Sequence, residues 1–304
     1  MFIPCDHCLR KNATHVSEVD DRGETANLRL CGECYRKLKQ DLAHRPAHFL
    51  HPKMTVGQNE LMIAAEMQFN LFPRRIPQVP GYDLSAWFRP SGDVGGDYYD
   101  MVEIDDDHLG LVVADVSTKG IQGMICMTET RALLRSEALR TTSPTETLTR
   151  VNQVLHQDFQ RGVFVTMYYA VLDIPQATLT CVSAGHNPMV LWRKASQTLN
   201  LIDPNGIPLG FDPGPVFEKT VRQQKIQLEA GDRFTFFTDG ILEATNEKKE
   251  LFGRRRLCLQ SQQHPDLPSE DFLKHLIRDV ERHCGHAPQS DDMAVVTGRF
   301  KGDV

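Results

Sequence analysis

Four aspartates that lie far apart in the sequence carry the most distinctive chemistry of this chain. Asp97 follows a glycine pair at the start of an expected strand, and Asp115 lies at the end of the next strand. Asp106, midway between them, lies in the turn, so an unbulged antiparallel hairpin places Asp97 beside Asp115. Asp239 closes a later strand and Asp291 opens the last one. If these two strands also pair antiparallel, their carboxylates share one edge of a sheet.

Carboxylates packed this closely require protons or cations between them. At about 4 Å, two such charges repel by about 4 kcal/mol at an effective dielectric constant of about 20. Oxygen ligands without Cys or His in the same motifs favour Mg²⁺ or Mn²⁺ over zinc. Two such ions can hold a phosphoryl group and generate hydroxide from bound water near neutral pH. We therefore expect phosphoester hydrolysis.

The elements that must position these aspartates are mostly strands, interrupted by two blocks of helices. The residue patterns predict strands over 82–89, 94–104, 109–116, 163–174, 177–182, 189–192, 216–228, 233–238 and 293–300. They predict helices over 121–139, 144–158, 254–262 and 269–284. This order favours an α+β layered sandwich over a doubly wound parallel sheet.

Eight motifs in this part of the chain occur in the order found in one protein family. They are Ala65-Glu-Met-Gln68 with Leu71-Phe-Pro73, Pro80-Gly-Tyr82, Val94-Gly-Gly-Asp-Tyr-Tyr-Asp100, Ala114-Asp-Val-Ser117, Ala184-Gly-His-Asn-Pro188, Pro208-Leu-Gly210, Thr238-Asp-Gly-Ile-Leu-Glu-Ala244 and Asp291-Asp-Met293. Over about residues 60–300 the chain resembles the SpoIIE-like, RsbU-type branch of the metal-dependent protein phosphatases (PPM). The resemblance implies an αββα four-layer sandwich with a binuclear Mn²⁺ or Mg²⁺ centre. It also implies a serine/threonine phosphatase whose substrate is a phosphorylated protein, such as an anti-sigma-factor antagonist.

The resemblance further implies roles for individual residues. The aspartate that matches Asp115 bridges the two metals, and the carbonyl that matches Val116 is a ligand. Those that match Asp239 and Asp291 hold one metal, and the one that matches Asp97 lies close to the metals, often through water. The metal-ligand and catalytic carboxylates expected here are therefore Asp97, Asp115, Asp239 and Asp291.

Several nearby residues depart from the family pattern or have two interpretations. Thr118 and Ala294 replace residues that are usual in the family, and no histidine follows Asp115 as it does in eukaryotic relatives. Lys119 is either a contact for substrate phosphate or, preferably, a solvated residue at the start of a helix. His186 is either a proton donor or, preferably, a turn histidine satisfied by backbone hydrogen bonds. Asp100 and Asp292 are candidates only for supporting roles.

The first 45 residues carry a second potential metal site. Cys5, Cys8, Cys31 and Cys34 form two CxxC knuckles separated by 22 residues, which is the ligand spacing of a tetrahedral zinc site. Between them, alternating polar and apolar residues on both sides of Gly23 predict a hairpin. We expect a small zinc ribbon with one structural Zn²⁺, in a segment that resembles the amino-terminal zinc motif of the McsA group of bacterial adaptors. Disulfides and a redox CxxC are the less favoured interpretations.

Residues 46–76 are expected to form a linker and a helix, followed by the phosphatase domain over 77–304. His44, His48 and His51 are interpreted as part of the polar linker, because Pro46 and Pro52 interrupt any helix there. Over 58–72 the apolar residues follow a helical spacing that ends at Phe72. This face either packs on the next domain, which we favour, or forms the seam of a homodimer.

Composition limits the remaining functions. The chain of 304 residues carries a net charge of −6, with no basic excess of the kind that nucleic-acid binding requires. No apolar run approaches the length of about 18 residues that a membrane span needs, and no signal peptide opens the sequence, so we expect a cytoplasmic protein. Two alternative functions stay open: a catalytically silent phosphoprotein-binding module, or an adaptor that acts mainly through its zinc ribbon.

Overall fold

The computed structural model describes residues 15–20, 25–30 and 56–302 of the chain. The chain divides into two compact units, Met1–Asn70 and Leu71–Val304. The four cysteines of the predicted zinc site and the three linker histidines lie outside the described residues. The zinc ribbon therefore stays a prediction.

The first unit contains a hairpin and a helix. Strands β1 (His15–Asp20) and β2 (Thr25–Leu30) pair antiparallel, with His15 opposite Leu30, as the alternating sequence predicts. Helix α2 spans Val56–Phe69 and ends before Phe72, so the predicted helix over 58–72 is wrong at its end. The reason is local, because Pro73 and the turn that precedes it terminate the helix.

Phe72 belongs instead to the aromatic core of the second unit. Its ring stacks on Phe88 at a centroid distance of 4.4 Å and on Tyr99 at 5.1 Å. Phe72 is buried, which explains its apolar character without any role on the helix.

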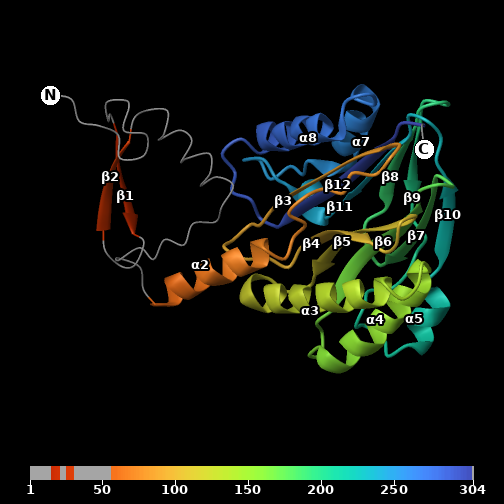
Figure 1. The fold of residues 1–304 in the computed structure, drawn as a ribbon, viewed down its shortest axis with the longest axis horizontal. Coiled ribbons are helices and arrows are strands. Elements are labelled where there is room, and N and C mark those ends of the chain that lie inside the picture. Colours follow the sequence, from red (N-terminus) through yellow and green to blue (C-terminus); the bar gives the residue numbers. More distant parts are fainter. Residues whose placement is uncertain (1–14, 21–24, 31–55, 303–304) are drawn as a thin grey trace. The chain divides into compact units, whose positions relative to one another are not determined.

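The second unit consists of two antiparallel sheets, each of five strands, between two layers of helices (Figure 1). The first sheet has the order β10-β7-β6-β5-β4, with β4 Tyr98–Glu103, β5 His108–Val116, β6 Val165–Asp173, β7 Thr178–Ala184 and β10 Gln223–Gln227. The second has the order β3-β12-β11-β8-β9, with β3 Tyr82–Arg89, β8 Met189–Arg193, β9 Thr198–Ile202, β11 Arg233–Phe237 and β12 Met293–Phe300. The predicted α+β sandwich is confirmed.

Helices cover the outer face of each sheet. The first sheet carries α3 (Gly120–Ala138), α4 (Pro144–Asp158) and α5 (Pro215–Thr220). The second carries α6 (Asp239–Glu243), α7 (Gly253–Gln263) and α8 (Ser269–Cys284). Ser143 caps α4 by accepting a hydrogen bond from the Glu146 amide, with Pro144 at the first helical position, as its sequence predicts.

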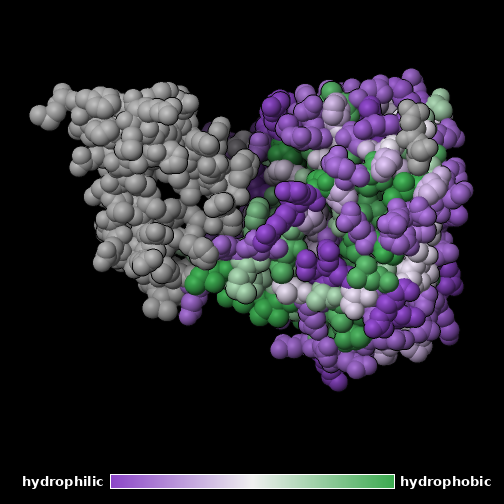
Figure 2. Space-filling model, viewed as in Figure 1, coloured by the Kyte–Doolittle hydropathy of each residue, from purple (hydrophilic) through white to green (hydrophobic). Residues whose placement is uncertain are grey.

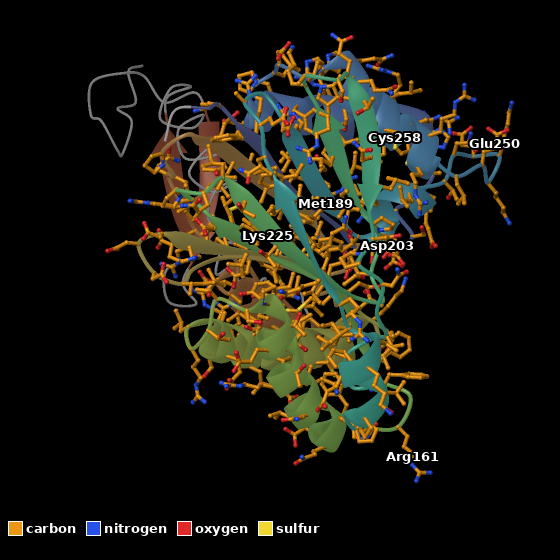
Figure 3. All side chains as sticks on the ribbon, turned by 90° about the vertical axis from the view of Figure 1, so that its right-hand side faces the viewer. Arg161, Met189, Asp203, Lys225, Glu250 and Cys258 are labelled. Carbon is orange, nitrogen blue, oxygen red and sulfur yellow. The ribbon has the colours of Figure 1, made fainter. Side chains whose placement is uncertain are left out.

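Alternating side chains on the strands build two cores. On β11, Phe234 and Phe236 point between the sheets, where Phe236 lies 5.2 Å from the ring of Tyr168 on β6. Phe237 points the other way and packs in a cluster with Phe272 of α8. Figure 3 shows the side chains that fill the space between the sheets, whereas Arg161 and Glu250 extend away from the fold.

The segment 216–228 is predicted as a strand, and this prediction is wrong for its first part. Residues Pro215–Thr220 form α5, and only Gln223–Gln227 form strand β10. The Asp212 carboxylate accepts hydrogen bonds from the amides of Gly214, Val216 and Phe217 and so starts the helix. Burial of Phe217 then holds the short helix against the domain.

On the face of the molecule seen in Figure 2, hydrophilic residues predominate and hydrophobic residues are interspersed among them. The exposed large apolar side chains include Ile121 and Ile125 of α3 and Phe211 in the loop before α5. Within the described residues, every helix is too short or too polar to cross a bilayer.

Candidate metal centre

The hairpin of β4 and β5 brings Asp97 and Asp115 together. Tyr98 lies opposite Ala114, and the same register continued by one residue places Asp97 opposite Asp115, as the sequence predicts. Burial raises the pKa of Asp97 well above its ordinary value, and the charge of Asp115 raises it further.

The second sheet contributes another pair of carboxylates. Strands β11 and β12 pair antiparallel, and the Thr238 amide donates to the Ala294 carbonyl at 3.0 Å just beyond the end of β11. Asp239 then opens α6, and Asp291 precedes β12. Burial raises the pKa of Asp239, with further contributions from the charges of Glu243 and Asp291.

The two pairs meet at one edge of the sandwich. Burial, followed by the charge of Asp239, raises the pKa of Asp115 to about 7, and the charges of Asp291 and Asp292 act in the same direction. Asp115 belongs to the first sheet, whereas Asp239 and Asp291 flank strands of the second. Asp115 is therefore the residue through which the four aspartates singled out by the sequence are connected electrostatically, because it interacts with Asp97, Asp239 and Asp291. Val116 follows Asp115 at the end of β5 and is buried.

The side chains fit a hard divalent cation. Oδ2 of Asp97 is buried without a hydrogen-bond partner, and the surrounding donors are carboxylate oxygens. Among the described residues, no three His, Cys, Asp or Glu side chains form a ready-made metal-binding group as they stand. The Asp291 carboxylate forms an ion pair with Lys119. One buried and three half-buried carboxylates that repel one another, with one oxygen atom unsatisfied, form the kind of donor set that Mg²⁺ or Mn²⁺ prefers.

Asp292 has a definite structural role that the sequence leaves open. Its Oδ1 accepts hydrogen bonds from the Ser91 amide at 2.7 Å and the Ser91 hydroxyl at 2.9 Å. Its Oδ2 accepts from the Gly96 amide at 2.7 Å. Asp292 therefore ties the start of β12 in the second sheet to the loop that leads into β4 of the first, and so sets the position of Asp97.

Glycines leave the space that the contacts of Asp292 require. A Cβ atom on Gly95 would lie 1.9 Å from Oδ2 of Asp292, and one on Gly240 would lie 1.9 Å from the Asp292 carbonyl oxygen. A Cβ on Gly96 would lie 3.2 Å from the carbonyl oxygen of Val116. The Gly-Gly pair before Asp97 is thus explained by the close approach of backbone and carboxylate.

Asp100 lies outside the cluster. Its carboxylate accepts hydrogen bonds from Arg135 at 2.7 and 2.8 Å and from the Tyr98 hydroxyl at 2.6 Å. It is fully buried and fastens α3 to β4. The supporting role considered for Asp100 is therefore that of a helix anchor.

His186 joins the two sheets beside the carboxylates. Its Nε2 lies 3.1 Å from the Phe237 carbonyl oxygen at the end of β11, and its Nδ1 lies 2.8 Å from the hydroxyl of Thr166. Thr166 is the cross-strand partner of Asp115. A carbonyl oxygen only accepts, so Nε2 carries the proton and the neutral ring accepts at Nδ1. The favoured interpretation of His186 as a turn residue satisfied by backbone hydrogen bonds is confirmed for Nε2, whereas the partner of Nδ1 is the Thr166 side chain.

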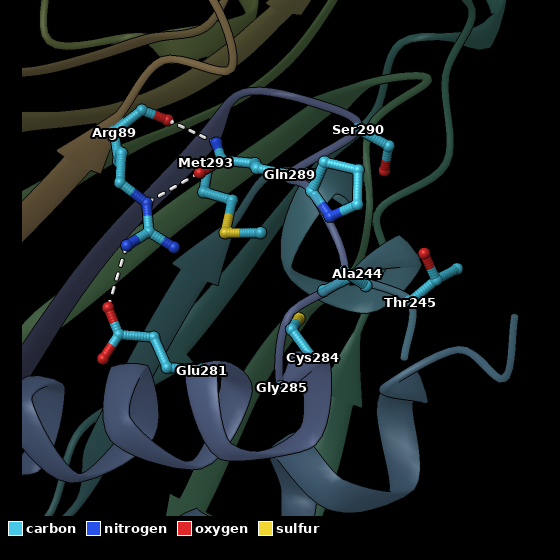
Figure 4. A pocket seen from close by; sticks show the side chains of 11 residues that line it. Arg89, Ala244, Thr245, Glu281, Cys284, Gly285, Gln289, Ser290 and Met293 are labelled. Atoms are coloured by element: carbon cyan, nitrogen blue, oxygen red, sulfur yellow. Dashed lines mark hydrogen bonds and ion pairs between the residues drawn. The ribbon is translucent and has the colours of Figure 1, made fainter. Parts of the chain in front are cut away.

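A pocket of about 360 Å³ lies behind the loop that carries Asp291 (Figure 4). The Nε of Arg89 donates to Gln289 at 2.7 Å, and Arg89 also pairs with Glu281 at 2.8 Å. The side-chain Nε2 of Gln289 donates to the Arg89 carbonyl at 3.0 Å and to the Asp291 carbonyl at 2.7 Å. This network fixes the backbone of Asp291. Sequence reasoning missed it, because no motif links residues 200 positions apart.

We predict that Gly95→Ala destabilises the domain, because the new methyl group displaces the Asp292 carboxylate from its hydrogen bonds. The expected loss is about 2–4 kcal/mol, which lowers the Tm by about 5–15 °C. Thermal unfolding followed by circular dichroism measures it. Gly92→Ala is the matched control, since its nearest neighbour would be the Val94 carbonyl oxygen at 3.7 Å. Equal Tm values for the two variants would contradict the role given to Gly95.

We predict a pH-dependent contribution of His186 to stability. Burial lowers the pKa of His186 from 6.5 to about 4, so the unfolded chain binds the proton more readily. The stabilisation by neutral His186 is fully present above pH 6.5 and is lost as the pH falls toward about 4. When the pH is lowered from about 7.5 to about 5, the free energy of unfolding falls by about 2 kcal/mol more in the wild type than in His186→Gln, whose side chain does not titrate. Urea unfolding at both pH values is the measurement, and parallel losses in the two proteins would refute the assignment.

Comparisons with known proteins agree with this architecture. The family model described as Stage II sporulation protein E (SpoIIE) matches residues 105–301. Phosphoserine phosphatase RsbU of Bacillus subtilis is 30% identical over 250 residues, which cover 80% of this chain and 71% of RsbU. Phosphoserine phosphatase RsbP of the same organism is 23% identical over 239 residues, covering 77% of this chain and 56% of RsbP.

The fold is also that of solved structures. The SiaA-PP2C domain of Pseudomonas aeruginosa superposes with a TM-score of 0.71 at 20% identity, covering 81% of this chain and 100% of that domain. The extent of the SpoIIE match and the identity to RsbU show the family. The chain therefore belongs to the SpoIIE family and, with it, to the metal-dependent protein phosphatases.

Proposed function

We propose that this chain hydrolyses phosphoserine or phosphothreonine in a signalling protein by means of two Mn²⁺ or Mg²⁺ ions. The observation that supports this most is the convergence of Asp97, Asp115, Asp239 and Asp291 from two different sheets. Asp115 would bridge the ions, with the Val116 carbonyl as a further ligand. Asp239 and Asp291 would hold one ion, and Asp97 would approach through water. The phosphatase domain is proposed to span 77–304.

When bound, the ions would supply a hydroxide for attack on phosphorus and neutralise the phosphoryl oxygens. The protein contributes the positions of the ligands. Asp115 lies on an interior strand of its sheet, between β4 and β6, so its backbone has little freedom. Asp292, His186 and Gln289 each fasten one ligand-bearing segment to another part of the domain. Preorganised ligands of this kind lose little entropy when ions and substrate bind.

The proposed substrate is a phosphorylated protein, such as an anti-sigma-factor antagonist. Support comes from the names of RsbU and RsbP as phosphoserine phosphatases and from the family resemblance of the motifs. The site lies at the edge of the sandwich, where the side chain of Asp291 is 26% exposed, so a residue on a folded partner can reach it.

The departures at Thr118 and Ala294 do not favour a silent binding module. Ala294 is fully buried, and its side chain belongs to the core between the sheets. A residue with that orientation supports the strand and leaves the carboxylates unchanged. The Thr118 hydroxyl is buried without a hydrogen-bond partner, but Thr118 is not one of the four proposed carboxylate ligands.

For the amino-terminal segment we propose a zinc ribbon with Cys5, Cys8, Cys31 and Cys34 as ligands. It would serve docking or regulation of the phosphatase. The hairpin of β1 and β2, which lies between the two knuckles in sequence, supports this proposal. Thiolates and carboxylates select different metals, so the chain would carry Zn²⁺ at one end and Mn²⁺ or Mg²⁺ at the other.

We predict that Asp115→Asn and Asp239→Asn each lower phosphatase activity by about a hundredfold or more, because a ligand charge that holds the ions is lost. Phosphate release from a phosphorylated protein is measured with added Mn²⁺. Chelation of the metal abolishes wild-type activity. Asp106→Asn is the matched control, because this exposed aspartate lies in the turn between β4 and β5.

A second measurement separates ligand loss from unfolding. Without divalent ions, Asp115→Asn has a Tm at or above that of the wild type, because one of the repelling charges is gone. Mn²⁺ raises the Tm of the wild type but not that of the variant. Full activity of Asp115→Asn or Asp239→Asn would refute the site assignment.

We predict one zinc ion per chain that is independent of the phosphatase centre. Combined replacement of Cys5 and Cys31 by Ser removes zinc from the purified protein, as metal analysis by mass spectrometry shows. Cys258→Ser keeps it, since Cys258 lies on α7 in the phosphatase unit. Zinc retained after loss of Cys5 and Cys31 would exclude the proposed ligands.

A further inference from the structure

Lys119 places an ammonium group on one of the proposed metal ligands. Its Nζ lies 2.8 Å from Oδ2 of Asp291 and donates to the Ser290 carbonyl at 3.1 Å. Lys119 follows β5, which carries Asp115, whereas Asp291 precedes β12 of the other sheet. The ion pair therefore spans the edge where the carboxylates of both sheets meet.

This is the one ion pair that the five clustered aspartates form with a basic side chain in the described part of the chain. Those aspartates are Asp97, Asp115, Asp239, Asp291 and Asp292. Lys119 thus supplies the local positive charge nearest to the repelling carboxylates.

The position of Lys119 is unfavourable for the helix that it precedes. Lys119 is the N-cap residue of α3, and its side chain makes no capping hydrogen bond. Lysine is not among the residues that cap helices well, and a positive charge near a helix N-terminus opposes the helix dipole. The stabilisation that offsets this unfavourable effect on the helix therefore comes from the ion pair with Asp291.

The side chain retains freedom to move. It is 64% exposed, compared with 26% for Asp291. An exposed lysine has a long flexible stem and three donors, and it exchanges partners at little cost. A divalent ion on Asp291 would compete directly with the ammonium group for the same carboxylate oxygen.

We propose that Lys119 is a tethered cation with two partners. It neutralises Asp291 while no divalent ion is bound there, and it contacts the phosphoryl group of the substrate once the ion has taken Asp291. The second role rests on the proposed phosphatase function. Displacement leaves the ammonium group beside a site that would hold a phosphoryl dianion, which is the partner that such a group binds best.

The proposal predicts opposite effects of one substitution on two ligands. In Lys119→Gln, Mn²⁺ binds about two- to fivefold more tightly, because the intramolecular competitor is gone. Inorganic phosphate inhibits the Mn²⁺-loaded variant about tenfold more weakly, and the KM for phosphoprotein rises more than kcat falls. Titration calorimetry with Mn²⁺ in phosphate-free buffer measures the first effect, and inhibition by phosphate measures the second.

Two further variants serve as controls. Lys119→Arg keeps the charge and stays close to the wild type for both ligands. Lys225→Gln removes an exposed positive charge from β10, away from the carboxylates, and so reports the effect of net charge alone. A Lys119→Gln protein that binds Mn²⁺ no more tightly than Lys225→Gln would overturn the first role.

Unchanged inhibition by phosphate in Lys119→Gln would overturn the second role. Failure of the underlying function is recognised separately, because the wild type itself would then bind no Mn²⁺ and release no phosphate. A weaker affinity of Lys119→Gln for Mn²⁺ would contradict competition and would make Lys119 a support for Asp291.

Discussion

Carboxylates crowded at one edge of the sandwich repel one another, and the architecture of the domain has to hold them in place against this repulsion. Asp97, Asp115, Asp239 and Asp291 gather at one edge of the sandwich, and burial and mutual charge raise the pKa of the first three. Such an arrangement works against folding unless cations or protons intervene. The rest of the domain holds the carboxylates together despite this repulsion, with two packed sheets, two hydrophobic cores and several long-range hydrogen bonds.

Those hydrogen bonds connect the two sheets close to the carboxylates. Asp292 links the start of β12 to the loop before β4, and His186 links the neighbour of Asp115 to the end of β11. Gln289 fixes the backbone at Asp291 from the pocket side. None of these groups is a proposed metal ligand. Loss of the hydrogen bonds of Asp292 or His186 would loosen the contact between the two sheets, whereas loss of those of Gln289 would free the Asp291 segment from β3 within the second sheet.

Local patterns predicted most strands and helices of the second unit. The register of β4 and β5 agrees with the predicted hairpin of Asp97 and Asp115, because counting residues from the turn fixes the register of an unbulged antiparallel pair. Predictions failed where one long-range or side-chain contact outweighed the local pattern. The Asp212 carboxylate starts a helix in a segment whose composition is typical of a strand. Phe72 fits the helical spacing of the sequence but lies beyond the helix, because its ring stacks in the aromatic core. The short helix α6 after Asp239 was also missed, since five residues carry too little periodicity.

Residue type, motif order and turn position are local properties, and they were enough to predict the fold class, the family, the clustered aspartates and the pairing of Asp97 with Asp115. Four features became visible only in the folded domain: the meeting of the two acidic pairs, the anchoring of α3 by Asp100, the hydrogen bond of Asp292 to the Gly96 amide, and the ion pair of Lys119 with Asp291. Each of these depends on which elements pack together across the sandwich. That packing is set by the sum of many contacts between distant residues, and no single segment of the chain encodes it.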